Sequence, residues 1–167
     1  MPQRYFLDTS ALIPRYLRLA GGHDWVESLC VPTTGNLIAL VEITGVEFCS
    51  ALNQTVRGGT LSKRISDRHI TEFWNDMDTG AYEIIPVSWV LVRRAADLSS
   101  LHSLKGYDAV QLTAALTYRE DARALDAIEA AAGRPVRGDP IFLTEDNRLA
   151  AAAAAEGFAV DSPLNHP

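Results

Sequence analysis

Short apolar runs alternate along the chain with longer stretches in which apolar residues recur every three or four positions. The short runs are typical of buried strands, and the longer stretches are typical of amphipathic helices. Strands are predicted at Arg4–Leu7, Leu37–Leu40, Tyr82–Val87, Ile141–Leu143 and Phe158–Val160. Helices are predicted at Ala11–Leu19, Asp24–Cys30, Val41–Val56, from Ser62 onward, and at Trp89–Leu101, Asp108–Tyr118, Glu120–Ala132 and Glu145–Glu156. This alternation favours an α/β fold, a central parallel sheet of about five strands with helices on both faces.

The composition fits a single domain over residues 1–167. Of the 167 residues, 47% are hydrophobic and 22% are charged, which is enough to bury one core at this size. A polar, alanine-rich segment at about 119–140 is predicted to be a helical insertion in that domain. No apolar run is long enough to cross a membrane or to form a secretory signal. We therefore expect a cytoplasmic protein in which Cys30 and Cys49 are reduced.

The formal net charge of −6 is unevenly distributed. Residues 120–167 hold nine acidic residues and four arginines, a balance of −5, whereas residues 1–119 hold twelve acidic and eleven basic residues. Within the first part, four basic residues outnumber the single Asp67: Arg57, Lys63, Arg64 and Arg68. These four predict either a local basic patch or an ordinary solvated helix face.

Four acidic residues stand where the predicted strands and helices meet. Asp8 and Asp146 follow predicted strands, and each could equally serve as the cap of the next helix. Asp108 precedes a strongly apolar helix, and Glu47 lies among apolar residues in the middle of another. Glu42, five residues earlier, is the alternative to Glu47 for the same role. A carboxylate buried without a partner is costly, so these acids are candidate site residues.

Several carboxylates at one edge of a sheet would repel one another unless a cation lay among them. Mg²⁺ and Mn²⁺ prefer oxygen ligands, whereas His23, His69, His102 and His166 form no zinc-ligand spacing. A divalent cation held by carboxylates polarises phosphoryl oxygens and activates water. This combination predicts a metal-dependent hydrolase of phosphodiesters.

Four segments also resemble, in order and spacing, the motifs of PIN-domain ribonucleases, notably VapC-type toxins. They are Leu7-Asp8-Thr9-Ser10-Ala11-Leu12, Val46-Glu47-Phe48-Cys49-Ser50-Ala51-Leu52, Tyr107-Asp108-Ala109-Val110-Gln111-Leu112-Thr113-Ala114-Ala115 and Phe142-Leu143-Thr144-Glu145-Asp146-Asn147-Arg148-Leu149. The resemblance implies a Rossmann-like, PIN-like three-layer α/β/α sandwich. It also implies an endoribonuclease in which Asp8, Glu47, Asp108 and Asp146 hold Mg²⁺ or Mn²⁺, supported by Thr9, Ser10 and Thr144.

The same resemblance implies partners. They are an RNA substrate, a second copy of the chain in a homodimer, and a small antitoxin whose segment covers the acidic pocket. Candidate contacts to RNA phosphates are Arg57, Lys63, Arg64, Arg68 and Arg148.

Other functions fit the sequence less well. A phosphatase of the haloacid dehalogenase kind needs a second acid where Ser10 stands, and a receiver module needs a lysine after a late strand. Two alternatives stay open: a stand-alone PIN-domain nuclease of RNA processing, and a PIN-like protein that binds RNA or a partner without cleavage.

Overall fold

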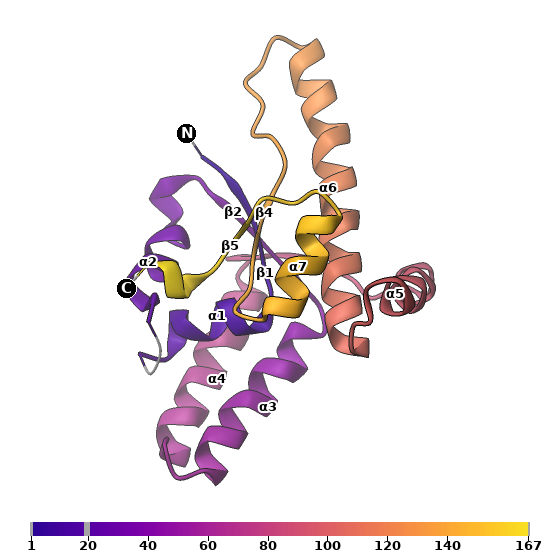
Figure 1. Ribbon diagram of the computed structural model, residues 1–167. Coiled ribbons are helices and arrows are strands. Elements are labelled where there is room, and N and C mark those ends of the chain that lie inside the picture. The colour runs from indigo at the N-terminus through magenta and orange to yellow at the C-terminus, as the bar shows by residue number, and fades with distance from the viewer. Residues whose placement is uncertain (1, 19–20, 167) are drawn as a thin grey trace.

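The computed structural model describes residues 2–18 and 21–166 of the chain. Within them, five parallel strands form one sheet in the spatial order β3-β2-β1-β4-β5 (Figure 1). The strands are β1 (Arg4–Leu7), β2 (Leu37–Val41), β3 (Glu83–Ile85), β4 (Ile141–Leu143) and β5 (Val160–Asp161). The register pairs Phe6 of β1 with Ala39 of β2 and with Phe142 of β4. The predicted parallel sheet is confirmed.

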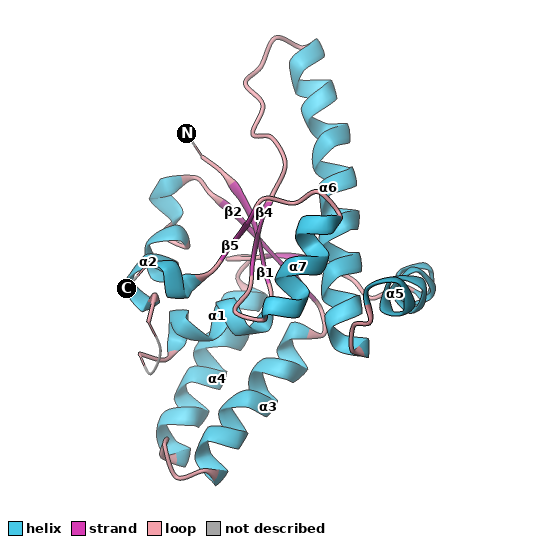
Figure 2. Ribbon diagram, viewed as in Figure 1, coloured by secondary structure: helices cyan, strands magenta, loops and turns pink. Residues whose placement is uncertain are grey.

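Helices cover both faces of this sheet (Figure 2). On one face lie α1 (Thr9–Tyr16), α2 (His23–Leu29), α3 (Thr44–Arg57) and α4 (Lys63–Asp78). On the other lie α5 (Trp89–His102), α6 (Gly106–Ala131) and α7 (Asn147–Ala155). Two short 3₁₀ helices, Pro32–Thr34 and Pro163–Asn165, complete the described elements.

Alternation along the strands divides the core into two layers. Phe6 and Phe142 stack with ring centroids 5.4 Å apart on the side of α5, α6 and α7. Leu7 and Leu143, one residue further along each strand, pack on the side of α1 to α4. Successive strand residues point to opposite faces, and both faces of a parallel sheet are buried. The α/β fold, a three-layer α/β/α sandwich, is confirmed.

One helix is longer than the sequence predicted. The helices expected at Asp108–Tyr118 and Glu120–Ala132 form the single helix α6. The change from apolar to polar residues suggested two elements, but the intervening Arg119 is a good helix former and no glycine or proline interrupts the run. The second half of α6 projects beyond the sheet, and residues 132–140 return to β4 (Figure 1). We call α6 from Glu120 to Ala131, together with residues 132–140, the arm.

Several element boundaries also differ from the prediction. Helix α1 ends at Tyr16 because the backbone of Leu17 is extended, and the predicted end at Leu19 lies outside the described residues. Helix α3 begins at Thr44 rather than Val41, which belongs to β2, and α7 begins after Asp146. Strand β3 is shorter than predicted, and β5 begins at Val160. Across the described ranges, no helix has the length and apolar character needed to span a bilayer.

Candidate functional site

Strands β1 and β4 lie side by side in the middle of the sheet, where the order of the strands reverses. From β1 the chain proceeds to β2 and β3 on one side, while β4 and β5 lie on the other. Open parallel sheets bind ligands in the crevice at the carboxyl ends of such strands. Asp8 directly follows β1 and Thr144 directly follows β4. The topology therefore places both residues at this crevice.

Four helices begin around one pocket of about 430 Å³, and each brings a carboxylate to it. Asp8 caps the N-terminus of α1, and Asp146 caps that of α7. Glu47 lies in the first turn of α3, and Asp108 lies in the first turn of α6. The partial positive charge at a helix N-terminus favours a carboxylate there. The structure thus brings all four acids predicted from the sequence into a single pocket, which we call the acid pocket.

Asp8 accepts three hydrogen bonds from described residues on one of its two carboxylate oxygens. The hydroxyls of Ser10 and Thr144 donate to Oδ2 at 2.6 and 3.0 Å, and the Ser10 backbone N–H donates to it at 3.3 Å. Ser10 Oγ in turn accepts from the N–H of Glu145, and Thr144 Oγ1 accepts from that of Asp146. These bonds join the start of α1 to the turn after β4. They leave Oδ1 of Asp8 for a ligand in the pocket.

Glu47 also accepts hydrogen bonds on one of its two carboxylate oxygens, from residues of α1 and α6. The Thr9 hydroxyl and the Gln111 amide each donate to its Oε2 at 2.7 Å. Gln111 is fully buried, and its Nε2 also lies 3.1 Å from the Thr9 hydroxyl and 3.3 Å from the Thr44 hydroxyl. The bonds to Glu47 all end on Oε2, so its Oε1 is left for a ligand.

Asp146, like Asp8 and Glu47, accepts hydrogen bonds on one of its two carboxylate oxygens. The backbone N–H groups of Arg148 and Leu149 donate to its Oδ1 at 2.8 and 2.9 Å. Capping a helix and serving a site are therefore compatible roles, because the cap occupies one oxygen and the second remains available. Asp8 likewise caps its helix and lines the acid pocket.

The acid pocket holds its carboxylates without a cationic partner. Among the described residues, none of the four forms an ion pair with Lys, Arg or His at 4.0 Å or less. Burial raises the pKa of Asp8, against the opposing effect of the Ser10 and Thr144 hydrogen bonds. Burial also raises the pKa of Glu47 and of Asp108, and neighbouring carboxylates raise both further. Clustered acids with raised pKa values are typical of functional sites.

Gln111 and Thr44 belong to this site, although the sequence analysis assigned them no role. Gln111 stands three residues after Asp108 in an otherwise apolar helix, where a lone amide is costly to bury without partners. The isolation of Gln111 among apolar residues was the signal in the sequence that could have identified it as a site residue. Thr44 begins α3 and is also fully buried.

Glu42, the alternative to Glu47, lies elsewhere. It is an exposed residue in the turn between β2 and α3, and its Oε2 accepts from the backbone N–H of Val87 at 3.0 Å. Glu42 does not line the acid pocket. The geometry therefore favours Glu47 as the acid contributed by α3.

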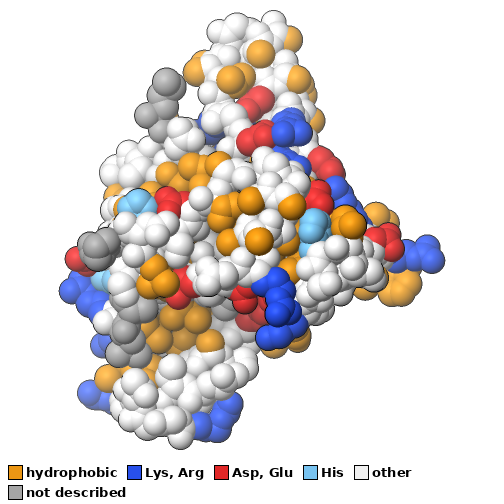
Figure 3. Space-filling view, viewed as in Figure 1, with side chains coloured by type: hydrophobic (Ala, Val, Ile, Leu, Met, Phe, Trp, Pro, Cys, Tyr) orange, Lys and Arg blue, Asp and Glu red, His pale blue; other side chains and the backbone are white. Residues whose placement is uncertain are grey.

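The predicted basic contacts lie mainly at the far end of the α3–α4 hairpin. Gln54 lines the acid pocket, and Arg57 follows one turn later at the end of α3. Lys63 and Arg64 begin α4, and blue side chains are visible at the lower end of this hairpin in Figure 3. Lys63 pairs with Asp67 on its own helix at 2.8 Å. The remaining two predicted contacts, Arg68 and Arg148, lie on α4 and α7.

The donor set of the acid pocket fits a hard divalent cation. Three of the carboxylates present one oxygen to protein donors and keep the other without one. Neighbouring carboxylates raise the pKa of Glu47 and of Asp108, so a cation between them would relieve this repulsion. An all-oxygen set suits Mg²⁺ or Mn²⁺, which retain several waters and need only a few carboxylate ligands.

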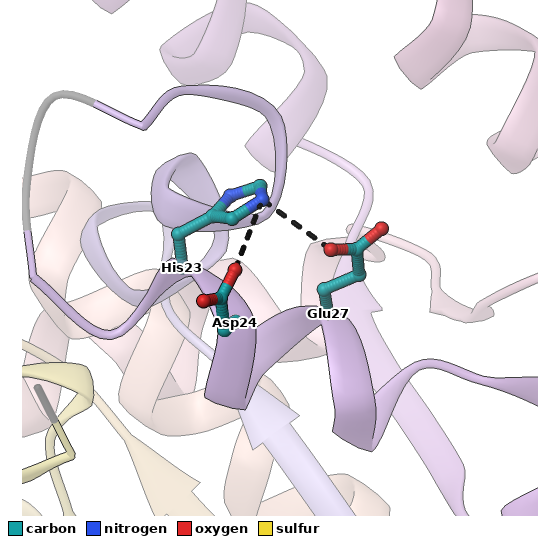
Figure 4. A group of neighbouring side chains, drawn as sticks. All are labelled: His23, Asp24 and Glu27. Carbon is teal, nitrogen blue, oxygen red and sulfur yellow. Dashed lines mark ion pairs between the residues drawn. The ribbon is translucent and has the colours of Figure 1, made fainter.

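A tighter group of metal-ligating side chains occurs on α2. One ligand atom from each of His23, Asp24 and Glu27 lies within 4.8 Å of the others. Figure 4 shows the His23 ring beside the two carboxylates. His23 Nε2 lies 3.9 Å from Asp24 and 3.3 Å from Glu27, while Arg18 lies 3.5 Å from Asp24. Both acids are exposed. Asp24 thus has Arg18 as a cationic neighbour, and His23 and Glu27 line a different pocket together with Arg68 and Glu72 of α4.

Comparisons with known proteins support the fold. The crystal structure of PAE2754 from Pyrobaculum aerophilum matches 95% of this chain and 83% of its own, with a TM-score of 0.59 and 16% identity. The crystal structure of VapBC2 from Rickettsia felis bound to a DNA fragment from their promoter matches over 96% and 98%, with a TM-score of 0.55 and 12% identity. The chain shares its fold with both. No family model matches the sequence, and a search of curated proteins found no match.

Proposed function

We propose that this protein is a metal-dependent endoribonuclease of the PIN-domain type and the toxin of a toxin–antitoxin pair. The observation that supports this proposal most strongly is the acid pocket itself. It gathers Asp8, Glu47, Asp108 and Asp146 at the crevice of a parallel sheet, and none of them has a cationic side chain in ion-pair contact within the part of the chain that the structure describes. The shared fold with a VapBC2 structure supports the same assignment.

The four carboxylates would hold Mg²⁺ or Mn²⁺, which when bound polarises a phosphoryl oxygen and activates water for attack on phosphorus. Attack breaks the bond from phosphorus to one bridging oxygen, and that oxygen leaves with a proton. The chain's own part is to fix the ligands. Ser10 and Thr144 fix Asp8, while Thr9 and Gln111 fix Glu47. Ligands that are already in position lose little freedom when the cation binds.

The proposed substrate is RNA, as the resemblance to PIN-domain ribonucleases implies, and its phosphates provide the anionic groups that a carboxylate-bound cation requires. Its path would run along α3, where Ser50 and Gln54 line the acid pocket and Arg57 follows. Lys63, Arg64 and Arg68 of α4 would extend this path, and Arg148 at the start of α7 would contact phosphates beside Asp146. Such contacts are independent of sequence and sensitive to salt.

The proposed antitoxin would neutralise the enzyme by covering the acid pocket. A peptide segment with a basic side chain could place its charge among carboxylates that have no cation of their own. We place the pair in the cytoplasm, where its RNA target lies. A short neighbouring gene for a basic DNA-binding protein would identify the partner, and its product should inhibit cleavage.

Cleavage of a labelled single-stranded RNA by purified protein tests the proposal. Cutting should require Mg²⁺ or Mn²⁺, stop with EDTA, and be absent from Asp8→Asn. Asp121→Asn is a matched control, because Asp121 is exposed on α6 and lies outside the acid pocket. Undiminished cutting in EDTA would contradict the metal mechanism. Binding of RNA without cutting, in either metal, would favour the non-cleaving alternative.

A further inference from the structure

The first turn of α2 brings an imidazole and two carboxylates together. His23 is followed by Asp24 and, one helical turn later, by Glu27. Residues four positions apart lie on the same face of a helix, so His23 and Glu27 are neighbours. The four histidines form no zinc-ligand spacing among themselves, but the spacing of His23 to these acids gathers three metal-ligating side chains at one point. No other three such side chains in the described ranges gather as closely.

The hydrogen bond of His23 Nδ1 decides which ring nitrogen can act as a metal ligand. Nδ1 contacts the backbone carbonyl oxygen of Pro14 in α1. A carbonyl oxygen only accepts hydrogen bonds, so Nδ1 must carry a hydrogen and donate it. In the neutral ring the lone pair is then on Nε2, which is the atom that faces Asp24 and Glu27. Metal-ligating histidines usually have this arrangement, in which one nitrogen donates to a carbonyl or carboxylate and the other binds the ion.

The distances between the three side chains suit the coordination sphere of a small divalent cation. Nε2 of His23 lies 3.3 Å from Glu27 Oε2 and 3.9 Å from Asp24 Oδ1, and the two dashed lines in Figure 4 meet at this nitrogen. Ligand atoms about 2.1 Å from a tetrahedral ion stand about 3.4 Å apart. Both measured distances exceed the roughly 2.8 Å of a charge-assisted hydrogen bond, so the three atoms leave a space between them.

The backbone that carries these side chains is fixed by the C-terminal 3₁₀ helix. Gly22 precedes His23 with a φ of +82°, and a Cβ atom at Gly22 would overlap the carbonyl oxygen of Pro163. Only a glycine therefore allows the two segments to approach so closely. Trp25 stacks on the His166 ring with centroids 3.8 Å apart. Ligands on a backbone held in this way are already in position for an ion.

We propose that His23, Asp24 and Glu27 form a second metal site, separate from the acid pocket, that binds Zn²⁺. One imidazole nitrogen and two carboxylate oxygens suit Zn²⁺ better than Mg²⁺, and three protein ligands leave a fourth position for water. The ion would hold the first turn of α2 and, through the carbonyl of Pro14, the adjoining part of α1. The site lines a pocket other than the acid pocket, so the proposal stands whether or not the protein cleaves RNA.

The cation nearest to this site, Arg18, competes with the ion only weakly. Its guanidinium lies 3.5 Å from Asp24 Oδ1, but the two side chains are 74% and 88% exposed. An ion pair so exposed contributes little, because water screens it and both side chains must be held in place. A divalent ion could therefore displace Arg18 from Asp24.

Calorimetric titration of the full chain with Zn²⁺ tests this site, in a buffer with excess Mg²⁺ that competes for all-oxygen sites. His23→Gln should lower the Zn²⁺ affinity by about a hundredfold or more, because a ligand is lost while the amide can still donate to the Pro14 carbonyl. Glu27→Gln should lower it by about tenfold or more. Arg18→Gln should raise it by about threefold, because the competing charge is removed.

A matched control and a melting measurement separate the site from general effects of substitution. His102→Gln also removes an imidazole beside a carboxylate, that of Glu156 at 2.7 Å, and should leave the Zn²⁺ affinity unchanged. Zn²⁺ should raise the melting temperature of the wild-type protein and of His102→Gln, but not that of His23→Gln. Absence of Zn²⁺ binding by the wild-type protein would overturn the proposal. So would an affinity unchanged in both His23→Gln and Glu27→Gln, or an equal loss in His102→Gln.

Discussion

The carboxylates of the acid pocket differ from those of the arm in their surroundings rather than in their chemistry. In and beside the arm, Glu120, Asp126, Glu129 and Asp139 each pair with an arginine, and the pKa of each is lowered. In the pocket, burial raises the pKa values of Asp8, Glu47 and Asp108, and neighbouring carboxylates raise those of Glu47 and Asp108 further. Four of the nine acids in segment 120–167 are thus paired with arginines, two of which lie inside the segment and two outside it. Among the described residues, the carboxylates of the acid pocket have no such arginine partner.

The largest effect on RNA cleavage is expected when Glu47 is substituted, in contrast to the same substitution at Glu42 in the turn before α3. Glu47→Gln removes a charged ligand from the acid pocket and should lower RNA cleavage by about a hundredfold or more. Glu42→Gln is the matched control, because Glu42 lies outside the pocket. It should retain nearly full activity. Equal losses of RNA cleavage in both variants would show that Glu47 is not a residue of the active site.

A second test breaks one ion pair of the arm. Asp126 binds the Arg4 guanidinium through two hydrogen bonds of 2.8 and 2.9 Å, and the Arg4 side chain is only 3% exposed. Asp126→Ala leaves that cation buried without its partner and should lower the free energy of unfolding by about 3 kcal/mol. Glu129→Ala breaks the exposed pair with Arg134 and should cost far less. Chemical denaturation measures both variants. Equal decreases in the free energy of unfolding would show that the burial of an ion pair does not determine its contribution to stability.

The side-chain amide of Gln111, which donates to Glu47, should affect the affinity of the acid pocket for a divalent cation. Gln111→Leu removes a donor to Glu47 Oε2, and the loss of such a supporting contact should weaken Mn²⁺ binding by about 10- to 100-fold. Gln54→Leu changes another residue of the pocket lining, one that donates only to Ser50 among the described residues. Titration calorimetry with Mn²⁺ compares the two. A similar affinity in Gln111→Leu and the wild-type protein would show that Gln111 only fills space.

Removing a basic residue from the proposed RNA path should have a smaller effect. Arg64→Ala should reduce the slope of log affinity against log salt by about one unit, because one phosphate contact is lost. Arg134→Ala should leave the slope unchanged, because Arg134 belongs to the arm and is paired with Glu129. A greater loss for Arg134 would place the RNA over the arm instead.

The pH dependence of stability should differ between the two regions in sign. The folded pKa of Asp8 is raised, so the folded state binds the extra proton between the unfolded and folded pKa values. The free energy of unfolding of the metal-free protein therefore falls as pH rises through this window. The Asp8→Asn variant does not lose stability in this way, because its amide does not titrate. The melting temperature of Asp8→Asn minus that of wild type should therefore be higher at neutral pH than near about pH 4.

The opposite sign is expected for Asp126, whose pKa is lowered first by its hydrogen bond with Arg4. Its contribution to stability should be present above the unfolded pKa and disappear as pH falls through the folded pKa. A pH-independent difference between Asp8→Asn and wild type would indicate that Asp8 acts as a helix cap alone.

The sequence predicted the strands and the four acids because these depend on local order. Asp8 directly follows a short apolar run, Asp146 follows another after two intervening residues, and parallel strands carry such residues to one edge. The continuity of α6 was missed because apolar periodicity changes near Arg119 while helix propensity does not. The pair of Arg4 with Asp126 joins residues 122 positions apart, and the contact of Gln111 with Glu47 joins residues 64 apart. Neither pattern nor spacing specifies such partners, because tertiary packing brings them together.

A crystal structure with Mn²⁺ tests the central claim most directly, because the ion can be located by its anomalous scattering. The account predicts an ion in the acid pocket at about 2.1 Å from a carboxylate oxygen of Asp8 and of at least one other of the four acids. Asp8→Asn should lose this ion under the same conditions. An ion bound only at His23, Asp24 and Glu27, with the acid pocket empty of metal, would contradict the account.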